Sequence, residues 1–197
     1  MPGFQTLFPT LLYSGTIKPL RGLAETCLGI AAEDKAGRRW ARDHGYGGYT
    51  SYASLNDLPL RASVFAELER AIAKHVSAFV RKSDFEMGGR KLALDSLWIN
   101  VMEKGAIHAP HIHPHSVVSG TYYVTVPESS GAIRFEDPRL PMLMAAPPKK
   151  AKAKNPTFVT VQPKPGMLLL WESWLRHGVE PNRAKGQRIS VSFNYGA

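Results

Sequence analysis

The sequence has little of what builds a disulfide-linked or membrane-spanning protein. Its single cysteine, Cys27, excludes an internal disulfide and lies in a helix-like apolar stretch, so we expect a buried thiol. No apolar run approaches the roughly 20 residues of a spanning helix, and no basic stretch precedes an apolar one at the start. A Gly-X-Ser-X-Gly elbow is also missing, which argues against serine hydrolase chemistry. We therefore expect a cytoplasmic protein that does not contact a membrane.

Acidic residues are also few, 16 against 25 basic ones, which gives a net charge of +9 and a pI near 9.8. Much of this excess is local, because Lys149, Lys150, Lys152 and Lys154 lie in the proline-rich segment 146–156. The segment has no interleaved aromatic residues and is typical of a solvated surface loop. We expect no nucleic-acid partner, although these lysines could contact an acidic substrate.

The composition is that of an ordinary folded protein, with 44% hydrophobic and 21% charged residues in 197. We predict one domain over 1–197, with residues 1–90 as helical support for the rest. In this first part, apolar spacing predicts helices over Leu20–Lys35 and Pro59–Lys82. An edge strand is predicted over Phe4–Tyr13, and the glycine-rich, aromatic stretch Gly45–Tyr52 is an ordered loop or strand entry that could line a pocket.

After residue 90 the pattern changes from helical to alternating. The strands that this alternation predicts are Leu92–Met102, Ser119–Val126, Ala132–Glu136, Thr157–Gln162, Met167–Trp171 and Gln187–Tyr195. Six short strands separated by turn residues predict a mainly β fold, a barrel or double-sheet jelly roll over 91–197, with the flanking helices on one outer face.

Histidines are few, seven in all, and four of them lie between positions 108 and 115. Side chains alternate along an extended strand, so His111 and His113 project to the same side and can bind one ion. A third imidazole from His177 would complete a facial triad. His113 with His115 is an alternative pair with the same geometry. Arg188, further downstream, suits an anionic ligand.

Other polar residues near these histidines are weaker candidates. His108 has the opposite parity from His111, so a surface or supporting role suits it better. Glu136 and Asp137 could lend a carboxylate to a metal, but the Asp137-Pro138-Arg139 sequence predicts a turn first.

The order of the motifs in this half resembles the 2-oxoglutarate (2OG) and iron(II)-dependent oxygenases of an uncharacterised bacterial type and, more distantly, the prolyl hydroxylases. The motifs that carry the resemblance are Trp98-Ile-Asn-Val, His111-Ile-His-Pro-His-Ser, Ser119-Gly-Thr-Tyr-Tyr-Val, Phe135-Glu-Asp-Pro-Arg, Pro165-Gly-Met-Leu-Leu-Leu-Trp, Ser173-Trp-Leu-Arg-His-Gly-Val and Arg188-Ile-Ser-Val-Ser-Phe-Asn. Together they cover roughly residues 96 to 195. The resemblance implies a double-stranded β-helix, the jelly-roll or cupin-like barrel.

The resemblance also implies an enzyme that uses Fe(II), 2OG and dioxygen, decarboxylates 2OG to succinate and hydroxylates a substrate. Arg188 would hold the remote carboxylate of 2OG, and Ser190, on the same strand face, would donate a second hydrogen bond. Tyr123 or Tyr122 could add a hydroxyl, and one of them must face away because adjacent strand residues alternate. Tyr123 is favoured, because it shares parity with Ser119 and Thr121. Asn100 either bonds the oxoacid or satisfies backbone groups.

The sequence departs from the family's pattern at one position, where His113 stands in place of the expected carboxylate. Three neutral histidines suit iron(II), but they are also a recurrent zinc set. The alternative function is therefore a cupin-like metal-binding barrel that is non-catalytic, or a zinc-dependent enzyme with the same ligands. The sequence is compatible with a small molecule or a peptide as substrate, and with a homodimer.

Overall fold

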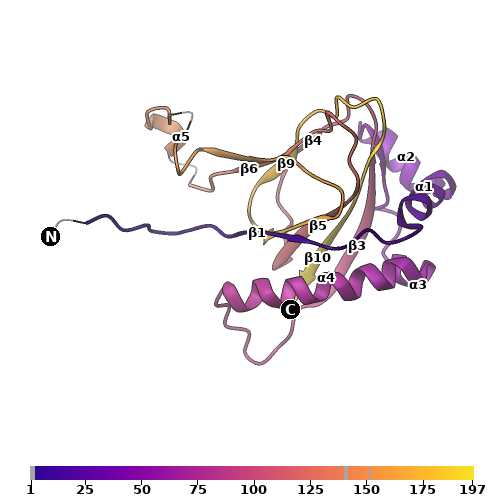
Figure 1. The fold of residues 1–197 in the computed structure, drawn as a ribbon, viewed down its shortest axis with the longest axis horizontal. Coiled ribbons are helices and arrows are strands. Elements are labelled where there is room, and N and C mark those ends of the chain that lie inside the picture. The colour runs from indigo at the N-terminus through magenta and orange to yellow at the C-terminus, as the bar shows by residue number, and fades with distance from the viewer. Residues whose placement is uncertain (1–2, 140–141, 151) are drawn as a thin grey trace.

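The computed structural model describes residues 3–139, 142–150 and 152–197, and its strands form two antiparallel sheets (Figure 1). In order across it, the larger sheet contains β1 (Leu12–Thr16), β8 (Met167–Glu172), β5 (Val118–Thr125), β10 (Arg188–Gly196), β3 (Ala93–Met102) and β2 (Gly48–Thr50). The smaller sheet contains β4 (His108–His111), β9 (His177–Val179), β6 (Ile133–Glu136) and β7 (Phe158–Val161). This arrangement is the mainly β barrel that the alternating pattern predicts.

The helices of the described residues are α1 (Leu23–Glu33), α2 (Lys35–Asp43), α3 (Leu58–Arg61), α4 (Ser63–Lys82) and α5 (Met142–Ala145). Helix α4 runs along the outer face of the larger sheet (Figure 1) and buries Phe65, Leu68, Ile72, Val76 and Phe79. This spacing of three and four residues forms one apolar stripe. The stripe packs with Cys27 and with alternate residues of the sheet in one hydrophobic core, as the predicted burial of Cys27 requires.

Alternation along the strands gives the two faces of the larger sheet different contents. In β10, Ile189, Val191 and Phe193 belong to the core under the helices. Arg188 and Ser190 line a cavity between the two sheets instead. The fold therefore carries its stability on one face and presents polar groups on the other.

The N-terminal strand begins later than Phe4–Tyr13. Only Leu12–Thr16 finds a partner, in β8, so β1 is an edge strand but the preceding residues are not part of it. Phe4 and Phe8 are exposed, and Pro9 has no amide hydrogen to donate. The predicted element is right in kind and wrong in its bounds.

The helical prediction needs two further corrections. The chain forms a second helix, α2, directly after α1, and its basic sequence gave no apolar spacing to predict it; the Asp34 carboxylate accepts from the Gly37 amide at 3.0 Å and caps it. The predicted helix over Pro59–Lys82 is divided, because Ala62 is extended between α3 and α4.

In the smaller sheet, β9 was not predicted, and neither was the four-residue helix α5. Strand β4 was expected only as the extended segment that carries His111 and His113; it ends at His111, so His113 lies beyond it. Both strands are shorter than five residues and contain Pro110 or Gly178, so they have no apolar alternation. No helix in the described parts of the chain has the length and the apolar character needed to cross a lipid bilayer. The segment 146–156 is largely exposed as predicted, apart from residue 151, which lies outside the described residues.

Candidate metal centre

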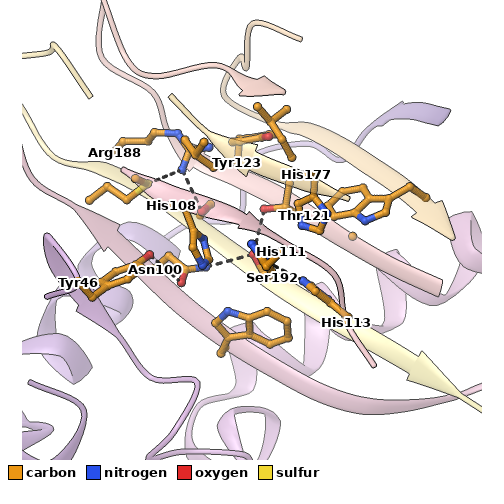
Figure 2. Close-up of a pocket in the computed structure, with 17 residues that line it drawn as sticks. Tyr46, Asn100, His108, His111, His113, Thr121, Tyr123, His177, Arg188 and Ser192 are labelled. Atoms are coloured by element: carbon orange, nitrogen blue, oxygen red, sulfur yellow. Dashed lines mark hydrogen bonds between the residues drawn. The ribbon is translucent and has the colours of Figure 1, made fainter. Parts of the chain in front are cut away.

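The three predicted histidines meet between the two sheets (Figure 2). His111 ends β4 and pairs directly with His177, which begins β9. His113 lies two residues after His111, beyond the end of β4. One ring nitrogen from each of the three histidines lies within 4.8 Å of the other two. The short strands β4 and β9 thus bring together histidines that are more than 60 residues apart in the chain.

Hydrogen bonds fix the tautomers of His111 and His177. The Nδ1 atom of His111 lies 2.8 Å from the carbonyl oxygen of Ala109, and Nδ1 of His177 lies 2.9 Å from that of Leu175. A carbonyl oxygen only accepts, so each Nδ1 carries the proton and donates it. The lone pair of each Nε2 is therefore free to bind a cation.

His113 has the same tautomer through a side-chain partner. Its Nδ1 lies 2.6 Å from Oδ1 of Asn194 and 2.9 Å from the Ser119 hydroxyl. Ser119 also donates to Asn194 Oδ1 at 2.8 Å and lies 2.7 Å from the Ser173 hydroxyl. This network makes the amide oxygen the acceptor and leaves Nε2 of His113 with its lone pair.

The Nε2 atoms of His111 and His113 lie 3.1 Å apart. Two imidazole nitrogens bound to one ion at about 2.1 Å and at a right angle lie about 3 Å apart. Two lone pairs that face each other at this distance repel, unless a cation lies between them. The donor set thus fits a divalent metal ion.

Burial keeps these rings neutral, which is the form that binds metals. It lowers the pKa of His111 and His113 and that of His177 to about 2. His108 is also inside, with its ring centroid 4.3 Å from that of His111, and burial lowers its pKa to about 3. We expected His108 either at the surface or in a supporting role. It lies in the cavity beside His111, which agrees with the supporting role.

The alternative ligands lie elsewhere. His115 is exposed in a turn with a φ of 69°, so the His113 and His115 pair does not form. Glu136 accepts from Arg176 at 2.9 Å, and Asp137 accepts from the Arg139 backbone at 3.0 Å in the predicted turn. Neither carboxylate joins the histidines.

Arg188 lies at the other side of the cavity (Figure 2), buried to 2% exposure. Its Nη1 contacts the Ser190 hydroxyl at 3.4 Å and the Met102 sulfur at 3.3 Å, and Nε has no hydrogen-bond partner among the described residues. The guanidinium carbon lies 5.0 Å from the centre of the Tyr123 ring. A buried cation without a carboxylate partner is costly unless an anion binds beside it.

This inner cavity is lined by side chains of both sheets, and none of them is a carboxylate. The lining residues are Tyr46, Trp98, Asn100, Met102, His108, His111, His113, Gly120, Thr121, Tyr123, Ile133, Trp171, His177, Val179, Arg188, Ser190 and Ser192. Three neutral histidines on one side and a permanent cation on the other suit a metal ion and a dianionic ligand together.

Tyr123 and Asn100 both line the inner cavity. The Tyr123 hydroxyl is buried without a partner in the described residues, and burial raises its pKa to about 12, so it is a neutral donor. Tyr122 lies in the helix-side core, as the strand parity predicts. The Asn100 amide accepts from Thr50 at 3.0 Å and donates to Ser192 at 3.1 Å, so its partners are side chains and not the backbone groups of our alternative.

The role of Asn194 was not predicted from the sequence. Arg188 and Ser190 were expected to share a strand face, and the same alternation places Ser192 and Asn194 on that face. All four side chains face the sites between the sheets. The alternation that predicted Ser190 contained the signal for the other two residues.

Comparison with known proteins agrees with this geometry. The sequence model of the family described as "Putative 2OG-Fe(II) oxygenase" matches residues 96–194, half of the chain. A prolyl-4-hydroxylase from Pseudomonas putida superimposes with a TM-score of 0.65 at 16% identity, over 95% of this chain and 94% of that one. HygX from Streptomyces hygroscopicus, with nickel and 2-oxoglutarate bound, gives 0.56 at 16% identity, over 95% and 82%.

Other comparisons are less complete. The chain spans 50% of the length of a Burkholderia pseudomallei oxidoreductase of the 2OG-Fe(II) oxygenase family, with 16% identity over 60% of this chain and a TM-score of 0.46. No curated protein matches the sequence. The prolyl-4-hydroxylase and HygX share the fold, a double-stranded β-helix, and the sequence model covers the three histidines and Arg188. The chain therefore belongs to the 2OG-Fe(II) oxygenase family, whose enzymes use iron(II), 2-oxoglutarate and dioxygen.

Proposed function

We propose that this enzyme hydroxylates its substrate while 2OG is decarboxylated to succinate. The overall reaction would convert 2OG, dioxygen and a C–H bond of the substrate into succinate, carbon dioxide and a hydroxylated product. In this proposal, His111, His113 and His177 hold iron(II), and Arg188 with Ser190 holds 2OG. When bound, the metal supplies the redox chemistry that couples the two oxidations.

The convergence of three free Nε2 atoms is the observation that carries the proposal. Each ring is held by a hydrogen bond at Nδ1, to Ala109, Asn194 or Leu175, so the donors are oriented before a metal binds. His113 fills the position of the expected carboxylate with a neutral donor. The protein ligands then add no negative charge, and the dianionic 2OG would balance a divalent ion by itself.

The other side of the inner cavity suits the remote carboxylate of 2OG. Nε of Arg188 is a buried donor with no partner among the described residues, and so is the Tyr123 hydroxyl. A carboxylate beside them would satisfy both and would pair with the buried charge. Asn100 lines the same cavity, where the amide hydrogen that it does not donate to Ser192 can position the bound oxoacid. The fixed side chains thereby orient 2OG, while the apolar walls exclude bulk water.

Succinate formation tests the proposed function. Metal-free protein would be loaded anaerobically with iron(II), then mixed with 2OG, ascorbate and air, and succinate would be quantified with and without a broad set of substrates. We expect slow formation without substrate, faster formation with the correct one, and none in His177→Ala. His115→Asn is the matched control, because this histidine lies outside the cavity and asparagine tolerates its left-handed backbone.

Metal identity separates the proposal from its alternative. Metal analysis of the purified protein should find iron, and Arg188→Ala should weaken 2OG binding while iron stays bound. Zinc as the native metal, with no succinate across the substrate screen, would overturn the oxygenase reaction and favour a zinc enzyme or a metal-binding barrel with the same histidines.

A further inference from the structure

A second cavity, the outer pocket, adjoins the three histidines. It has a volume of about 190 Å³. It shares with the inner cavity the side chains of Tyr46, Trp98, His108, His111 and His113. Arg188 lines only the inner cavity. A group in the outer pocket would therefore reach the metal centre without competing for the anion site.

Aromatic rings form most of the wall of the outer pocket. Trp40 comes from α2, Tyr46 and Tyr52 flank β2, and Trp98 comes from β3. The rings of Tyr52 and Trp98 are edge to face, with centroids 5.1 Å apart, and Tyr52 is 58% exposed at the mouth. Such walls favour a flat or ring-shaped apolar group. A cavity of about 150 Å³ can hold one benzene ring, so this pocket has the size for a single ring with a small substituent.

Charge decides between neutral and ionic groups. Among the described residues, no aspartate, glutamate, lysine or arginine lines the outer pocket. An anion would lose its water without gaining a cationic side chain, apart from the metal that 2OG already occupies. Aromatic faces attract cations, but here a cation would lie beside a divalent metal, and no carboxylate side chain lines the pocket to pair with it. An uncharged group avoids both costs.

Asn194 offers one directed hydrogen bond in the pocket. Its Oδ1 is occupied by His113 and Ser119, at 2.6 and 2.8 Å. Its Nδ2 has no hydrogen-bond partner in the described parts of the chain, and the residue lines the outer pocket. The Thr50 hydroxyl, by contrast, already donates to Asn100. The free amide hydrogens of Asn194 therefore call for a hydrogen-bond acceptor on the bound group.

We propose that the outer pocket binds an uncharged, ring-sized apolar group that carries a hydrogen-bond acceptor such as a carbonyl. This group is the part of the substrate that lies against the metal centre, so the inference rests on the proposed function. Charged groups on the rest of the substrate stay outside the pocket.

Three probes with the same ring test the choice of charge. Cyclohexanecarboxamide is neutral with a carbonyl, cyclohexanecarboxylate is an anion, and cyclohexylmethylammonium is a cation. Their dissociation constants would be measured by ligand-observed NMR with the full chain, loaded with metal and 2OG under nitrogen. The neutral probe should bind at least about tenfold more tightly than either ion, because the ions lose hydration without a partner. Equal or tighter binding of either ion, or no binding of the amide, would overturn the inference.

A pair of aromatic variants locates the binding. Tyr52→Ala should weaken amide binding by about threefold to tenfold through the lost ring contact. Trp174→Ala is the control, because this ring is 46% exposed and lies outside the pocket. Equal effects of the two variants would contradict the assigned site. Titration of the metal-free protein with metal and with the amide separates the two proposals. A chain that binds the amide but no metal contradicts only the proposed function. A chain that binds metal without selecting the neutral ring contradicts only this inference.

Discussion

The two faces of the six-stranded sheet are built by the same strands and have opposite chemistry. On β10 the helix side carries Ile189, Val191, Phe193 and Tyr195, and the barrel side carries Arg188, Ser190, Ser192 and Asn194. One side is covered by helices and the other faces the smaller sheet (Figure 1). Because side chains alternate, each polar residue of the barrel side is anchored by apolar neighbours on either side of it in the sequence. The barrel side is thereby held by the packing of the helix side.

Hydrogen bonding also differs between the faces. Four buried side-chain atoms have no partner in the described residues: the Arg188 Nε, the Tyr123 hydroxyl, the Trp171 Nε1 and the Tyr195 hydroxyl. The first three residues line the inner cavity, and only Tyr195 belongs to the helix-side core. Buried polar groups almost always have partners. Unsatisfied donors therefore gather where a bound group would supply the missing acceptors.

The largest effect on stability should come from the helix side. Phe193 is fully buried, and its ring packs over Gly120 so closely that a Cβ there would clash. Phe193→Ala should lower the free energy of unfolding by about 3–5 kcal/mol, measured by urea denaturation. Ser192→Ala, its neighbour on the barrel side, should lose only about 1 kcal/mol through its hydrogen bonds. Equal losses would show that the two faces do not divide stability and function in this way.

The next effect should appear on the barrel side, in binding and not in stability. Arg188→Met removes a buried charge that has no carboxylate partner among the described residues, so the melting temperature should stay the same or rise. The affinity for 2OG, measured by calorimetry with metal-loaded protein, should fall by about 100-fold through the lost charged hydrogen bonds. A variant that unfolds early but binds 2OG normally would assign Arg188 to the structural side of the comparison.

A smaller effect is expected where the barrel side holds His113. Asn194→Ala removes the acceptor that fixes the His113 tautomer and should weaken metal binding by about 10-fold to 100-fold. Cobalt(II) is a suitable probe, because its absorption spectrum also reports loss of one nitrogen ligand. Asn182→Ala, a buried asparagine that bonds the Met102 carbonyl away from the histidines, is the control. If both variants bind cobalt(II) like the parent, His113 needs no such tether.

The sequence predicted the apolar side of the comparison better than the polar side. The strand predicted over Gln187–Tyr195 is Arg188–Gly196 in the structure. Apolar and polar residues alternate along its whole length, and this pattern identifies a strand without knowledge of its neighbours. Strand β9 and the end of β4 at His111 escaped prediction because the pairing of His111 with His177 is a tertiary contact. Apolar periodicity carries no information about such a contact.

For the candidate site, the sequence predicted which residues come together but not the hydrogen bonds that orient them. Spacing and motif order grouped the three histidines with Arg188, and the structure brings them around one cavity. The hydrogen bonds that the histidines donate to Ala109, Leu175 and Asn194 could not be predicted, because they depend on backbone bends and on a partner 81 residues away. His115 could be excluded only from the left-handed turn that points the chain away after His113.

The smallest effect compares two tyrosines whose buried hydroxyls lack partners on opposite faces. Tyr123→Phe should leave stability unchanged and weaken 2OG binding by about threefold to tenfold, the value of one hydrogen bond to a bound carboxylate. Tyr195→Phe should not change 2OG binding, and stability should stay the same or rise, because an unsatisfied buried hydroxyl is removed. Calorimetry with 2OG and thermal unfolding on the same samples measure both quantities. If Tyr195→Phe also weakened 2OG binding, the helix side would take part in the chemistry. If Tyr123→Phe left 2OG binding unchanged, the Tyr123 hydroxyl would have no role in holding the co-substrate.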